Sequence, residues 1–69
     1  MDRRSPATLA RWHRNDGEIV RQGDPICEIE TDKASVDLEA WRDGILRHLA
    51  KVGDAVRAGD EVARIDPVQ

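Results

Sequence analysis

The residues best placed to do chemistry lie in one short polar segment around Lys33. The segment reads Glu30-Thr31-Asp32-Lys33-Ala34 and separates two runs, 26–29 and 36–38, that have the composition of short β-strands. This arrangement predicts a β-hairpin with Lys33 at its tip. An amine in that position points into water, which suits a side chain that another molecule must reach and does not suit a buried ion pair.

The other reactive residue types form no catalytic or metal-binding pattern. His13 and His48 lack the Cys/His spacing of a zinc site, so we expect surface or sheet-facing histidines. Cys27 is expected to be a small core residue. Lys51 is the only other lysine, and no Asp-Lys-Ala sequence surrounds it. No nucleophile, base and oxyanion arrangement can be assembled, so we assign no catalytic residue, no metal ligand and no enzymatic activity.

Length and composition restrict the class of protein further. The chain has 69 residues, which predicts one small domain with too little core for a large enclosed active site. Its 14 acidic and 11 basic residues give a net charge of -3, which argues against nucleic acid and polybasic membrane contacts as partners. A single cysteine excludes an internal disulfide framework. With no secretory signal and no membrane-length apolar run, we expect a soluble intracellular protein.

An internal repeat organises the rest of the sequence. Residues 7–30 and 43–66 align without gaps at a constant offset of 36, with seven identities. The alignment also places Leu9 opposite Ile45, and Cys27 opposite Ala63. The glycines fall at turns and the aliphatic residues in strands in both copies. The identical pairs are Arg11/Arg47, Gly17/Gly53, Val20/Val56, Arg21/Arg57, Gly23/Gly59, Asp24/Asp60 and Ile29/Ile65.

The repeat predicts an all-β fold with little or no helix. Each copy has a strand, a glycine turn, a short apolar link, a second glycine turn and a final strand. The expected strands are 8–13, 25–30, 36–40, 45–50 and 61–66. They should form a small flattened barrel or sandwich of two quasi-symmetric antiparallel sheets, a barrel-sandwich hybrid. We take residues 1–69 as one domain, with an irregular N-terminus at 1–6 and a tail or linker start at 67–69.

One strand has no counterpart in the first copy. The alternating segment 36–40 predicts a half-buried strand, but 36 residues earlier the chain begins with the charged run Met1-Asp2-Arg3-Arg4. The first edge strand is therefore expected to be short or missing. Its absence predicts an unpaired sheet edge that a partner or a second copy could cover.

Taken together, these motifs resemble a lipoyl domain of the biotinyl/lipoyl attachment family. The resemblance covers about 8–66, and its most specific part is the Asp32-Lys33-Ala34 core within the run 28–34. In related biotinyl domains methionines typically flank the modified lysine, whereas Asp32 and Ala34 stand there in this chain. The remaining matches are Trp12, the Gly17 turn, Gly23-Asp24, Asp43-Gly44, Gly53-Asp54 and Gly59.

The resemblance implies a carrier with a swinging arm. Lys33 would be joined to lipoic acid through an amide, and Glu30, Asp32 and Ala34 would help enzymes recognise the attachment turn. The arm would shuttle acyl groups and reducing equivalents between active sites of a 2-oxo acid dehydrogenase complex. Implied partners are a lipoate ligase or lipoyl transferase, a thiamin-dependent 2-oxo acid decarboxylase, an acyltransferase core and dihydrolipoyl dehydrogenase. The compartment implied is the bacterial cytoplasm, or the mitochondrial matrix in a eukaryote.

Two other readings stay open at this point. One is a biotinyl carrier domain of a carboxylase, which the missing methionines disfavour. The other is an unmodified barrel-sandwich interaction module. Full-length lipoyl domains also begin with an extra strand and a recognition loop before the segment that corresponds to Thr8, so recognition by a decarboxylase is a separate question from lipoylation.

Overall fold

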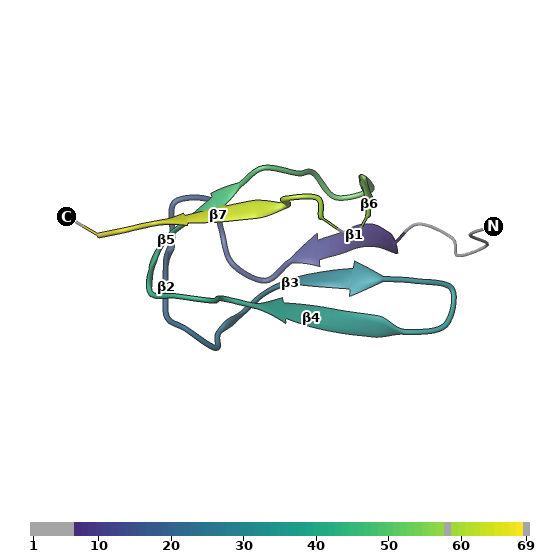
Figure 1. Ribbon diagram of the computed structural model, residues 1–69, viewed down its shortest axis with the longest axis horizontal. Helices are drawn as coiled ribbons and strands as arrows, with labels where there is room; N and C mark the ends of the chain where they lie inside the picture. The colour runs from purple at the N-terminus through teal and green to yellow at the C-terminus, as the bar shows by residue number, and fades with distance from the viewer. Residues whose placement is uncertain (1–6, 58, 69) are drawn as a thin grey trace.

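The computed structural model describes residues 7–57 and 59–68, and every regular element within them is a β-strand. The expected irregular N-terminus at 1–6 and the last residue of the predicted tail lie outside the described residues. No helix in the described ranges could span a membrane. The strands shown in Figure 1 are β1 (Ala7–Trp12), β2 (Ile19–Val20), β3 (Pro25–Glu30), β4 (Ser35–Glu39), β5 (Gly44–His48), β6 (Ala55–Val56) and β7 (Ala63–Asp66).

The strands form two antiparallel sheets, as predicted. One has the order β4-β3-β1-β6 and the other the order β2-β5-β7. Each repeat therefore places its short middle strand in the sheet of the other repeat, which ties the two halves together. The sheets do not close into a barrel within the described residues, so the fold is the sandwich form of the prediction. The buried core between the sheets consists of Leu9, Val20, Ile26, Cys27, Ala40, Leu46, Val62, Ala63 and Ile65.

The hydrogen bonds confirm the repeat and correct its register at one point. The N–H of Gly17 donates to the carbonyl of Leu46, and the N–H of Gly53 donates to the carbonyl of Leu9. Leu9 is thus equivalent to Leu46, and the predicted pairing of Leu9 with Ile45 is wrong. A β-bulge between Leu9 and Arg11 explains the difference, because Ala10 is an extra residue that β5 lacks.

Four tight turns share one construction. In each, the third residue is a glycine with φ between 88° and 96°, a backbone conformation that costs other residues about 1–2 kcal/mol. The N–H of the fourth residue donates to the carbonyl of the first, and the carboxylate of the fourth accepts the N–H of the first. The turns begin at Asn15, Arg21, Lys51 and Arg57.

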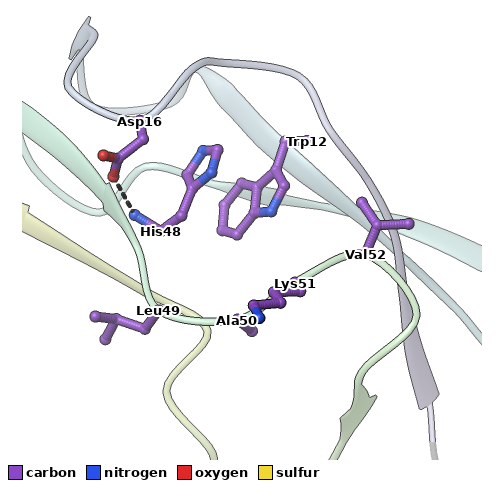
Figure 2. Close-up of a pocket in the computed structure, with 7 residues that line it drawn as sticks. All are labelled: Trp12, Asp16, His48, Leu49, Ala50, Lys51 and Val52. Atoms are coloured by element: carbon purple, nitrogen blue, oxygen red, sulfur yellow. Dashed lines mark hydrogen bonds between the residues drawn. The ribbon is translucent and has the colours of Figure 1, made fainter.

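A ring pair joins the two repeats. Trp12 and His48, which are equivalent at the offset of 36, stack with centroids 3.6 Å apart and planes 8° from parallel. The N–H of His48 donates to Asp16 Oδ1 at 2.7 Å, and its Nε2 lies 2.9 Å from the carbonyl oxygen of Arg14. Figure 2 shows the pair beside a shallow hollow whose other lining residues include Leu49, Lys51 and Val52. Trp12 is partly buried and packs against the core.

One expectation about exposure is only partly met. Trp41, just after β4, is half exposed. Val36, predicted to lie on the half-buried face of its strand, is 59% exposed because it lies next to the turn, beyond the end of the core. Leu38 and Ala40 on the same face do reach the core.

Candidate functional site

The hairpin of β3 and β4 presents Lys33 at one pole of the molecule. The two strands pair from Pro25↔Glu39 to Glu30↔Ser35, which leaves Thr31–Ala34 as the connecting turn. In Figure 1 this turn and the end of β7 lie at opposite ends of the long axis. A chain continuing after β7 would therefore leave from the pole opposite Lys33.

The side chain of Thr31 closes the turn. The backbone N–H of Thr31 donates to the carbonyl of Ala34 at 2.7 Å, and the Thr31 hydroxyl donates to the same oxygen at 3.1 Å. In return, Thr31 Oγ1 accepts the N–H of Ala34 at 3.1 Å and that of Lys33 at 3.3 Å. The Thr31 hydroxyl thus holds two backbone N–H groups of the turn.

The Lys33 side chain is available to an enzyme. The residue is exposed, and within 7–57 and 59–68 no hydrogen bond or ion pair involves its ammonium group. The flanking Asp32 and Ala34 are exposed as well, and so is Glu30 at the end of β3. The structure thus brings together all four predicted site residues at the tip of one hairpin.

Negative charge is concentrated on the same hairpin. Residues 25–39 carry five carboxylates against the single cation of Lys33, although the whole chain has a net charge of only -3. Modification of Lys33 as an amide would remove that cation. The carboxylates belong to Glu28, Glu30, Asp32, Asp37 and Glu39.

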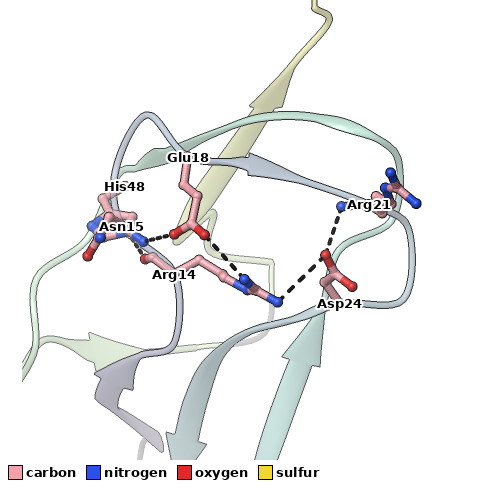
Figure 3. Close-up of polar contacts among 6 residues, drawn as sticks. All are labelled: Arg14, Asn15, Glu18, Arg21, Asp24 and His48. Atoms are coloured by element: carbon pink, nitrogen blue, oxygen red, sulfur yellow. Dashed lines mark hydrogen bonds and ion pairs between the residues drawn. The ribbon is translucent and has the colours of Figure 1, made fainter.

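A polar network fixes the pole opposite the lysine. Arg14 bridges Glu18 at 3.2 Å and Asp24 at 3.9 Å, and Asp24 accepts the N–H of Arg21 at 3.0 Å (Figure 3). The N–H of Asn15 donates to Glu18, and this bond, followed by the Arg14 guanidinium, lowers the pKa of the Glu18 carboxyl. The side chains of this network hold the two glycine turns that begin at Asn15 and Arg21, so they have a structural role.

His13 and Cys27 are both engaged in the fold. His13 Nε2 lies 2.9 Å from Asp37 Oδ1, which links the loop after β1 to β4. Cys27 is fully buried, and desolvation, followed by the charge of Asp37, raises the pKa of its thiol to about 11. The described residues contain no cluster of three or more side chains suited to a metal ion.

Comparison with known proteins places the chain in a family. A family model described as "Biotin-requiring enzyme", which covers biotin and lipoyl attachment domains, matches residues 3–65. A solved structure, the lipoyl domain of the 2-oxoglutarate dehydrogenase complex from Azotobacter vinelandii, is 32% identical with a TM-score of 0.74, over 88% of this chain and 78% of that one. The chain belongs to the biotin/lipoyl family as a lipoyl domain. A domain of this type is a small carrier unit rather than a catalyst.

The curated relatives of this lipoyl domain are much longer proteins. A dihydrolipoyllysine-residue succinyltransferase component of the 2-oxoglutarate dehydrogenase complex from Bacillus subtilis is 39% identical over 62 residues, which is 88% of this chain and 15% of that protein. A pyruvate dehydrogenase E1 component subunit beta from Rhizobium meliloti is 39% identical over 59 residues, 86% of this chain and 12% of that protein. Similar lipoyl domains are thus found in proteins of 2-oxo acid dehydrogenase complexes that act on different substrates.

The sequence analysis gave no separate role to Thr31, whose hydroxyl holds the lysine turn. Threonine hydroxyls bond nearby backbone groups in turns, which is a weak sequence signal for such contacts. The adjacent Asp32 gives the same signal more strongly. The structure shows that Thr31 Oγ1 accepts the N–H groups of Lys33 and Ala34.

Proposed function

We propose that Lys33 carries lipoic acid in amide linkage and that the domain is a lipoyl carrier of a 2-oxo acid dehydrogenase complex. The observation that carries this proposal is an exposed lysine without a partner among the described residues, at the tip of a hairpin, with Asp32 and Ala34 as its neighbours. When bound, the lipoyl group supplies a dithiolane that can accept electrons and an acyl group. The partners expected are a lipoate ligase or lipoyl transferase, a thiamin-dependent decarboxylase, an acyltransferase core and dihydrolipoyl dehydrogenase.

The residues around Lys33 suit such a group in three ways. The turn protrudes, so an enzyme can enclose the lysine without contacting the sheets. The side chain has no partner to lose among the described residues when it is modified. The amide bond removes its charge, so the arm carries no fixed cation into successive active sites. Tethering then raises the local concentration of the carried group at each site.

Mass spectrometry tests the attachment directly. The chain is incubated with a lipoate ligase, lipoate and ATP, and in parallel with a biotin ligase, biotin and ATP. We expect one lipoyl increment and no biotinyl increment. Lys33→Arg should abolish the increment and Lys51→Arg, which removes the only other lysine, should leave it intact. A biotinyl increment would support the biotinyl alternative, and no increment at all would support the unmodified interaction module.

A further inference from the structure

The lysine turn breaks the rule that the other tight turns of the fold obey. In the four glycine turns the third residue is glycine, with φ between 88° and 96°. Lys33 occupies this third place in Thr31–Ala34, and no non-glycine residue of the described ranges has a positive φ. The chain therefore reverses at Lys33 without the left-handed conformation that short hairpin loops usually require.

The hydrogen bonds explain how it does so. In the glycine turns the N–H of the fourth residue donates to the carbonyl of the first, at 2.9 or 3.0 Å. In the lysine turn the fourth residue is Ala34, and its N–H donates to the Thr31 hydroxyl instead. That hydroxyl also accepts the N–H of Lys33 and donates to the carbonyl of Ala34. A hydroxyl has one proton to donate and two acceptor sites, so its capacity is fully used within the turn.

We propose that Thr31 is a positioning residue for the modification of Lys33. Its hydroxyl replaces the backbone carbonyl as the acceptor that closes the turn, which allows a lysine to stand where the other turns need a glycine. A turn held in this way is already ordered when a ligase binds it, so less conformational entropy is lost on binding. This inference rests on the proposed function that Lys33 is lipoylated.

The test compares two substitutions of Thr31 with a matched control. Thr31→Val keeps the shape of the side chain and removes the hydroxyl, whereas Thr31→Ser keeps the hydroxyl. Ser35→Ala removes an exposed neighbouring hydroxyl for which the described contacts include no hydrogen bond. With lipoate ligase we expect kcat/KM to fall about tenfold for Thr31→Val, because several modest hydrogen bonds are lost together. Thr31→Ser and Ser35→Ala should remain close to the parent chain.

Amide hydrogen exchange separates positioning from direct contact with the ligase. In the free domain, Thr31→Val should accelerate exchange at the N–H groups of Lys33 and Ala34, and Thr31→Ser should restore protection. A thermal unfolding midpoint unchanged by Thr31→Val would show that the sheets are intact. If exchange at the two amides is unchanged in Thr31→Val, the hydroxyl does not order the turn. A fall in lipoylation would then mean that the ligase contacts Thr31 directly. Parent-like lipoylation of Thr31→Val overturns the positioning role. If the parent chain is not lipoylated, the proposed function fails, and the exchange data still show whether the Thr31 hydroxyl orders the turn.

Discussion

The two lysines of the chain hold different backbone positions. Both are exposed. Lys51 is the first residue of a glycine turn, and its N–H is held by Asp54 at 2.9 Å, close to the stacked Trp12 and His48. Lys33 is the third residue of a turn at the end of a protruding hairpin. The backbone position, rather than the amine, distinguishes them.

Cys27 should make stability depend on pH in the alkaline range. The pKa of its thiol is raised from 9.0 to about 11 in the folded state, chiefly by burial. Between these values the unfolded chain releases a proton that the folded chain keeps. Stability should therefore be fully present below pH 9.0 and decrease as the pH rises toward about 11. Urea unfolding at several pH values measures this, with Cys27→Ala as the control. An equally steep decrease in that variant would contradict the assignment.

Gly44 should be the least replaceable glycine of the chain. A Cβ built there would collide with the backbone carbonyl of Asp66 and the side chain of Ile65, whereas one at Gly17 would meet nothing within 4 Å. We expect Gly44→Ala to lower the free energy of unfolding by about 2–4 kcal/mol, since β5 and β7 must separate. Gly17→Ala should cost only about 1 kcal/mol, from its positive φ. If urea unfolding shows a similar loss of unfolding free energy for both variants, the backbone of Asp66 does not lie as close to Gly44 as described.

At the scale of elements, the β3–β4 hairpin combines a packed base with an exposed tip. Ile26 and Cys27 are both buried although they are adjacent, because the pairing with β4 is irregular between Pro25 and Cys27. Toward the turn the strands leave the core, and Val36 is exposed. The hairpin is thus fixed at one end and open to enzymes at the other.

The acidic charge of this hairpin should speed its encounter with modifying enzymes that present basic surfaces. Glu30→Lys should lower kcat/KM for lipoylation by a factor on the order of three to ten at low ionic strength, and added salt should shrink the difference. The matched control is Glu61→Lys, which makes the same charge change at an exposed site before β7. Recognition by Glu30 is refuted if its variant is lipoylated and reductively acylated as fast as the parent.

At the scale of the whole molecule, the two sheets have different edges among the described residues. The prediction that the first edge strand is short or missing falls on residues 1–6, which lie outside the described ranges. β4 covers the outer side of β3, but no strand of the described residues covers the outer side of β7. The carbonyl of Val62 accepts N–H groups from Leu49 and Ala50, so the backbone polar groups of Val62 point toward β5. By alternation, the backbone N–H and carbonyl groups of Ala63 and Ile65 point toward the open edge. We propose that this edge pairs with a second copy of the chain.

Hydrogen exchange at different protein concentrations tests the edge. The N–H groups of Arg64 and Asp66, which point toward β5, should be protected at all concentrations. Those of Ala63 and Ile65 should become protected only as concentration rises, in parallel with dimer measured by sedimentation. Fast exchange of these two amides at every concentration would exclude self-pairing through β7.

Much of the fold was predictable from local signals. Glycine turns and alternating apolar residues identified every long strand, and the offset of 36 related the two halves. The predicted bounds of β3 were confirmed, and the bounds of the other long strands differed by at most two residues, since hydrogen bonding to a neighbouring strand decides where pairing stops. The bulge at Ala10 could not be foreseen, because an ungapped alignment cannot show an extra residue that is absorbed within a strand.

The sequence by itself determined that this is an all-β repeat with Lys33 in the Asp-Lys-Ala setting of a lipoyl domain, since these depend on residue types at short spacing. Only the tertiary structure decided that Thr31 Oγ1 holds the lysine turn and that Trp12 stacks on His48. The first depends on the backbone conformation of the turn, and the second on the pairing of strands that lie far apart in the sequence. Short sequence patterns specify neither.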